Sequence, residues 1–68
     1  MDTIGSRIKK RRKELGLTQA ELADRIPKVH DTDISAWEKG LKKPGTLALE
    51  KLGKGLEMDA GSLLTGNE

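Results

Sequence analysis

The 68-residue sequence contains no cysteine, tyrosine or phenylalanine, and only one tryptophan and one histidine. Without cysteine the chain has no disulfide framework and no thiolate metal site, and zinc would have to rely on carboxylates. No apolar run approaches the roughly 20 residues that span a bilayer, and none follows the basic N-terminus as in a signal peptide. We therefore expect one cytoplasmic domain over residues 1–68, with no cofactor, metal or membrane partner.

Charge is distributed unevenly along the chain, although 13 basic and 11 acidic residues leave a net charge of only +2. Residues 1–16 carry six basic and two acidic side chains, residues 17–40 three and five, and residues 41–68 four of each. The N-terminal surplus suits a polyanion. The run from Arg7 to Lys13 is nevertheless more typical of a solvated helix face. It includes the core residue Ile8, so its basic side chains surround the helix and cannot form one flat patch. We expect Arg12 to turn inward.

The apolar residues recur at helical spacing, and no segment alternates like a strand, so we predict an all-α fold of five short helices. The predicted helices cover residues 3–15, 18–26, 31–39 and 46–56, and a last one begins at Asp59 and ends before Gly66. Their predicted buried residues are Ile4, Ile8, Leu15, Leu22, Ala23, Ile26, Ile34, Trp37, Leu49, Leu52, Leu56, Leu63 and Leu64.

The second helix has the clearest start signal. Thr18 and Glu21 have the spacing of a capping box, in which each side chain bonds the other residue's backbone amide. Leu17 and Leu22 flank this cap as a hydrophobic staple. Pro27 ends the helix because it disfavours helical geometry in the residue before it.

The second and third helices, joined by the short turn at residues 27–30, form a helix-turn-helix. Several sequence blocks then resemble, in the same order, those of the phage-repressor/Cro-type (lambda-repressor-like) helix-turn-helix family. They are Ile4-Gly5-x-Arg7-Ile8, Leu15-Gly16-Leu17-Thr18-Gln19-x-Glu21-Leu22-Ala23, Ile34-Ser35-x-Trp37-Glu38-x-Gly40, Lys43-Pro44 and Leu63-Leu64-x-Gly66. The resemblance covers residues 3 to 66, nearly the whole chain.

The resemblance implies a compact five-helix bundle that binds double-stranded operator DNA as a symmetric dimer, with the third helix in the major groove. It implies a sequence-specific transcriptional regulator, most simply a phage- or prophage-type repressor. The matching base-reading set is His30, Asp31, Thr32, Ser35 and Ala36. The phosphate set is Thr18, Gln19, Lys28, Lys39, Lys42 and Lys43. Arg12 and Glu38 match a structural ion pair.

The turn between the two motif helices departs from the family pattern. Seven residues separate Ile26 from Ile34, where the family usually has six. The turn reads Pro27-Lys28-Val29 where Gly-Val is common, which leaves the register of residues 28–30 open.

Two residues of the third helix carry alternative interpretations. Asp31 reads a base, for example by accepting from cytosine N4, or it caps the helix, and capping is favoured. Asp33 is interpreted as a first-turn acid that favours the helix dipole. Trp37 is expected to pack in the core rather than stack on a base. His30 and Ser35 lie on one short helix and its lead-in, so they are not expected to form a catalytic triad.

The sequence bears on three functions. A DNA-binding regulator, complete or the DNA-binding part of a longer chain with residues 66–68 beginning a linker, fits best. The alternative is a protein-interaction module on the same fold, such as an antitoxin-like partner, because residues 17–40 are acidic overall. An enzyme is not expected, since the sequence offers no nucleophile–base pair and no phosphate loop, and no small-molecule substrate is evident. Leu56, Met58, Leu63 and Leu64 either fill the core or form a homodimer surface on the C-terminal helices.

Overall fold

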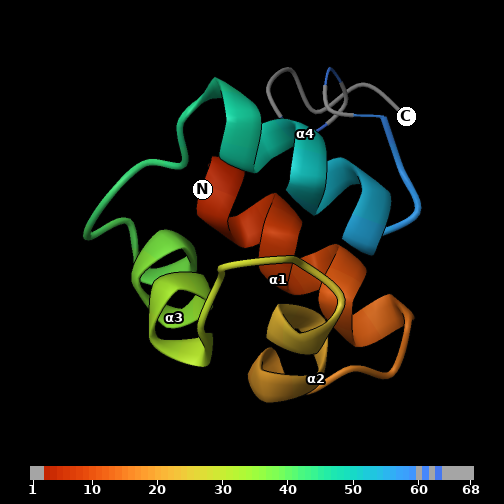
Figure 1. Ribbon diagram of the computed structural model, residues 1–68. Helices are drawn as coiled ribbons and strands as arrows, with labels where there is room; N and C mark the ends of the chain where they lie inside the picture. Colours follow the sequence, from red (N-terminus) through yellow and green to blue (C-terminus); the bar gives the residue numbers. More distant parts are fainter. Residues whose placement is uncertain (1–2, 60, 62, 64–68) are drawn as a thin grey trace.

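A computed structural model describes residues 3–59, 61 and 63. Within this part the chain forms α1 (Ile4–Glu14), α2 (Gln19–Asp24), α3 (Asp31–Lys39) and α4 (Thr46–Gly55). In Figure 1, α1 crosses the middle, with α4 above it, α2 below it and α3 to one side. The prediction of an all-helical fold is confirmed for these residues. The predicted fifth helix falls mostly on residues that the structure does not describe, among them Leu64 and Gly66.

Both of the first two helices begin with a capping box. At α2 the Thr18 hydroxyl accepts the Glu21 amide at 3.1 Å, and Glu21 accepts the Thr18 amide at 2.9 Å, as the sequence predicts. At α1 the Ser6 amide donates to Thr3, and the Thr3 amide donates to Ser6 at 2.8 Å. This second box was not predicted from the sequence, because serine replaces the usual Glu or Gln at the third helical position.

The core lies where the four helices meet, and it contains only one large aromatic ring, that of Trp37. Trp37 is 6% exposed, which fits the packing role predicted for it. The remaining buried apolar residues are Ile8, Leu22, Ala23, Ile26, Ile34, Leu49, Leu52, Leu56 and Leu63. Because Leu56 and Leu63 are fully buried in a single copy, they are core residues, and of the predicted dimer residues only the half-buried Met58 reaches the described surface.

Arginine side chains close the C-terminal end of α4. Arg11 Nε donates to the Leu56 carbonyl at 2.9 Å, and Arg25 donates to the Gly55 carbonyl at 3.1 Å. The last carbonyls of a helix lack partners within the helix and carry a partial negative charge, so these guanidinium groups stabilise the helix end. Arg11 belongs to the basic run of α1, so part of that run makes hydrogen bonds within the protein. Neither polyanion binding nor a solvated helix face describes the whole run.

The axes of α1 and α3 approach closely at Gly5, which is buried. A Cβ at this position would lie 2.3 Å from the Trp37 carbonyl oxygen and 2.8 Å from that of Glu38. Only a residue without a side chain allows the backbone of α1 to pack this near the C-terminal half of α3. Gly5 therefore sets the distance between α1 and the motif.

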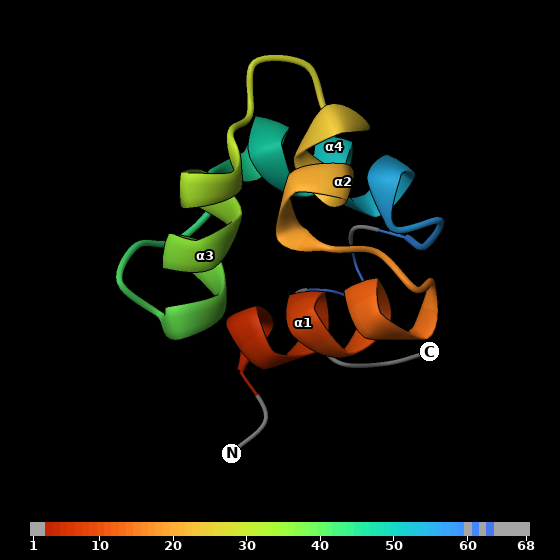
Figure 2. The same cartoon turned by 90° about the horizontal axis from the view of Figure 1, so that it is seen from below.

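The long turn between α2 and α3 lies at the edge of the molecule furthest from α1 (Figure 2). Lys28 has a left-handed backbone with φ of 62°, a conformation that non-glycine residues seldom adopt. Val29 packs against the core directly afterwards. The turn therefore changes direction at Lys28 and returns to the core at Val29.

Candidate nucleic-acid interface

One face of α3 is turned away from the core. Ile34 and Trp37 point inward, and at 3.6 residues per turn Thr32 and Lys39 fall on the opposite side. Both are exposed, while Ser35 and Ala36 on the same face are half-buried. We call these four residues the outward face of α3. It carries a hydroxyl, a methyl and an ammonium group within two turns, which are groups that can contact base edges and phosphates.

The first turn of α3 corrects one interpretation of the sequence. His30, and not Asp31, occupies the N-cap position, with extended φ and ψ of −108° and 161°. The Asp33 carboxylate accepts the His30 amide at 3.0 Å, so Asp33 satisfies the start of the helix from inside its first turn. Asp31 is exposed at the first helical position, so the interpretation of Asp31 as the cap was wrong.

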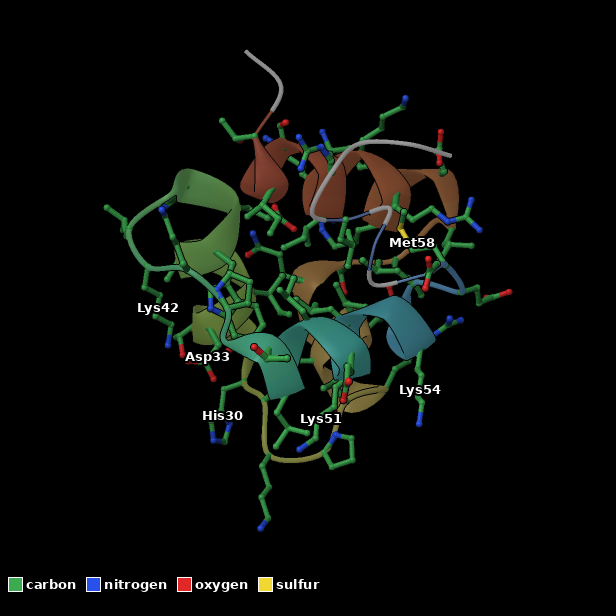
Figure 3. The ribbon with its side chains drawn as sticks, turned by 90° about the horizontal axis from the view of Figure 1, so that it is seen from above. His30, Asp33, Lys42, Lys51, Lys54 and Met58 are labelled. Atoms are coloured by element: carbon green, nitrogen blue, oxygen red, sulfur yellow. The ribbon has the colours of Figure 1, made fainter. Side chains whose placement is uncertain are left out.

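Lys42, from the loop after α3, folds back onto this first turn. Its Nζ lies 2.6 Å from Asp33 Oδ1 and 5.7 Å from the centre of the Trp37 ring. Figure 3 shows Lys42, Asp33 and His30 in succession along one edge of the molecule. The hydrogen bond from Lys42, followed by that from the His30 amide, lowers the pKa of the Asp33 carboxyl from its ordinary value of 3.8.

The depressed pKa of Asp33 predicts an acid-dependent part of the stability. The folded protein binds the Asp33 proton more weakly than the unfolded chain, so the stabilisation is complete above pH 3.8 and is lost as pH falls through the folded-state pKa. Compared with Asp33→Asn, the wild type should have a higher free energy of unfolding near neutral pH. This difference should shrink below pH 3.8 in urea titrations at several pH values. A difference that is constant across the acid range would contradict the assignment.

A buried ion pair joins α1 to α3. Arg12 Nε lies 2.7 Å from Glu38 Oε2, and Arg12 Nη2 lies 3.1 Å from Glu38 Oε1, with side chains 10% and 4% exposed. Arg12 also donates to the Leu17 carbonyl at 2.8 Å, and Gln19 donates to Glu38 at 3.2 Å. The hydrogen bond to Glu38 raises the pKa of Arg12 above its ordinary value. This network fixes α1, the start of α2 and α3 relative to one another.

The residues of the phosphate set occupy three regions of the structure. Thr18 and Gln19 form the start of α2, where Gln19 Nε2 uses one of its two hydrogens on Glu38. Lys39, Lys42 and Lys43 line a hollow between the start of α1 and the loop after α3, together with Thr3 and Arg7. Lys28 is exposed in the long turn. Four basic residues and one acidic residue, Glu38, line this hollow, so its charge is net positive.

The described residues also bear on metal, membrane and catalytic sites. No group of three or more His, Asp or Glu side chains in this part of the chain lies close enough to hold a metal ion. No helix there is long and apolar enough to cross a membrane. His30 is exposed at the N-cap of α3, whereas Ser35 is half-buried in the middle of that helix.

A protein-family model described as "Helix-turn-helix" matches residues 8–62. Among curated proteins, the HTH-type transcriptional regulator DicA of Escherichia coli (strain K12) is 39% identical over 66 residues. That alignment covers 97% of this chain and 48% of DicA, so the chain spans about half the length of its curated relative.

Solved structures agree with the family match. The P22 c2 repressor in complex with a synthetic operator superposes with a TM-score of 0.91 at 34% identity, covering 98% of this chain and all of the other. SinR, a regulator of biofilm formation crystallised with DNA, gives a TM-score of 0.82 at 35% identity over 90% of this chain and 97% of that one. Both relatives were crystallised on DNA, and this chain shares their fold over almost its full length.

Proposed function

The chain belongs to the helix-turn-helix family, and from this membership we propose that it is a sequence-specific regulator of transcription, of repressor type, that inserts α3 into the major groove of operator DNA. The observation that carries the proposal is the outward face of α3. The four residues of this face point away from the core. The Arg12–Glu38 pair and the close approach at Gly5 fix the backbone of α3 that carries them. A rigid helix with a free polar face is what base reading requires.

In this proposal the base-reading set works from the N-terminal half of α3. The Thr32 methyl contacts a thymine methyl, Ser35 bonds either class of base, and Ala36 leaves room for the groove floor. Asp31 accepts from a cytosine amino group, because His30 and not Asp31 occupies the N-cap of α3. His30 lies at the start of the helix and reaches the flanking base pair.

In this proposal the phosphate set binds the DNA backbone on either side of α3. Lys39 and Lys43 do so from the lysine-lined hollow, Lys28 from the long turn, and Thr18 and Gln19 from the start of α2. The Arg12–Glu38 pair aims Gln19 by holding its amide at 3.2 Å, and the second Nε2 hydrogen remains for a phosphate oxygen.

Removing a phosphate contact should weaken all DNA sequences about equally, because phosphates carry no sequence information. Lys43→Ala should also lower the slope of log affinity against log salt by about one unit, whereas the uncharged Gln19→Ala should leave the slope unchanged. Lys54→Ala is the control, since Lys54 projects from α4 away from α3 (Figure 3). Anisotropy titrations at several salt concentrations measure both quantities, and a changed sequence preference would mean that these residues read bases.

We also propose that the protein acts in the cytoplasm as a homodimer joined through its C-terminal helices. Two-fold symmetry would present two copies of α3 to half-sites one helical turn of DNA apart. Met58 is half-buried near the end of the described chain, and among the residues predicted for a dimer surface it is the described one that is not fully buried. Leu56 and Leu63 contribute indirectly, by fixing this end to the core.

A protein-interaction module is the second candidate, because exposed Asp31 places an acid at the tip of α3. The two functions differ in their response to salt. To distinguish the two functions, duplexes that bind the protein are selected from a randomised pool, and the enriched duplex is titrated at increasing salt. A regulator enriches a site and shows a steep salt dependence. An interaction module enriches nothing and ignores DNA at physiological salt.

A further inference from the structure

Lys42 connects the loop after α3 to the first turn of the same helix. One Asp33 oxygen accepts the Lys42 ammonium at 2.6 Å, and the other accepts the His30 amide at 3.0 Å. The ammonium lies 5.7 Å from the centre of the Trp37 ring, so it also contacts an aromatic face. Lys42 therefore contacts two residues of α3, Asp33 and Trp37, and Figure 3 shows it beside Asp33.

Asp33 lies at the flank of the surface that the proposed function brings to DNA. It follows the exposed Thr32 and precedes Ala36 by less than one turn, next to the base-reading set. A bare carboxylate here would repel phosphates, and like charges brought together at an interface are costly. The Lys42 ammonium, 2.6 Å away, makes the pair neutral.

We infer that Lys42 is a positioning residue that acts on DNA binding through Asp33, because its charge cancels the carboxylate charge at the interface. Lys42 itself binds no phosphate. This inference rests on the proposed function. A phosphate that took Lys42 from Asp33 would gain one ion pair and break another. It would also leave the unpaired carboxylate beside that same phosphate. Lys43, the next residue, is exposed in the same hollow and is the direct phosphate contact of this loop.

The inference is tested by a double-mutant cycle on the duplex that the wild type enriches. Lys42→Ala should weaken binding about tenfold, because it leaves Asp33 bare. Asp33→Asn should bind at least as tightly as the wild type, since its amide oxygen still accepts the His30 amide. In the Asp33→Asn background, Lys42→Ala should cost no more than about twofold. Lys42→Gln, which keeps a polar stem over Trp37 without the charge, should follow the same pattern and serves if Lys42→Ala unfolds.

Lys43→Ala is the matched control, and it should lose the same factor in both backgrounds. Equal losses from Lys42→Ala in both backgrounds, with the salt slope lowered by about one unit, would overturn the inference and make Lys42 a phosphate contact. Equal weakening in Asp33→Asn, Lys42→Ala and the double variant would also overturn it, since the pair would then act only by holding the loop. If the folded wild type enriches no duplex, the proposed function fails, and the inference fails with it.

Discussion

Replacing Arg12 with alanine is expected to leave most of the domain unfolded at room temperature. The Glu38 side chain is only 4% exposed, and the change removes the two hydrogen bonds of 2.7 and 3.1 Å from the guanidinium that neutralise its carboxylate. Removing one partner of a buried ion pair typically costs about 3–5 kcal/mol. A domain of this size has only about 3–5 kcal/mol of net stability. Circular dichroism in urea measures the loss.

The same experiment separates the ion pair from simple loss of packing. The double variant Arg12→Met/Glu38→Met removes both charges and keeps the volume, so it should recover much of the lost stability. Glu14→Ala is the control, because its 3.4 Å pair with Arg11 is exposed and should contribute less than about 1 kcal/mol. If the Arg12 and Glu38 losses simply add in the double variant, the two residues do not act as a pair.

Gly5→Ala is expected to produce the second largest loss of stability. Its new Cβ would lie 2.3 Å from the Trp37 carbonyl oxygen, and backbone atoms cannot move aside as a flexible side chain can. Either α1 and α3 separate or the end of α3 distorts, and overpacking of this kind costs about 1–3 kcal/mol or more. We expect about 3 kcal/mol by urea denaturation, despite the better helix propensity of alanine.

The Gly5 prediction has a control at the start of α4. A Cβ at Gly45 would meet nothing within 4 Å, so Gly45→Ala should change stability by less than about 1 kcal/mol. Because Gly5 contacts the backbone of Trp37 and Glu38, Gly5→Ala should also weaken DNA binding among the molecules that remain folded. Full stability in Gly5→Ala would show that α1 and α3 do not approach as closely as described.

Much of the fold was predictable because its signals are local. The range of α3, the capping box at Thr18 and the inward position of Trp37 each depend on residues within four positions of one another. The N-cap of α3 was assigned wrongly to Asp31, because aspartate is a stronger capping residue than histidine. Asp33 changes that preference by accepting the His30 amide from within the helix.

The candidate site was predictable only as far as the resemblance reached. The Arg12–Glu38 pair is present as the family pattern implies, but the bonds of Gln19 and Leu17 to it carry no signal in the sequence. The pair of Asp33 with Lys42 spans nine residues and depends on the path of an irregular loop. Periodicity does not describe such loops. The resemblance therefore placed Lys42 in the phosphate set, and no pattern in the sequence indicated its pair with Asp33.

The proposed function depends on base reading by the outward face of α3. Its most direct test is parallel selection from a randomised duplex pool with the wild type and with Thr32→Gln, which changes one exposed residue of that face. We predict paired half-sites centred about 10 base pairs apart for both proteins, with the preferred base changed at one position of each half-site. Identical sites from both proteins, or no enriched site from the wild type, would contradict the claim.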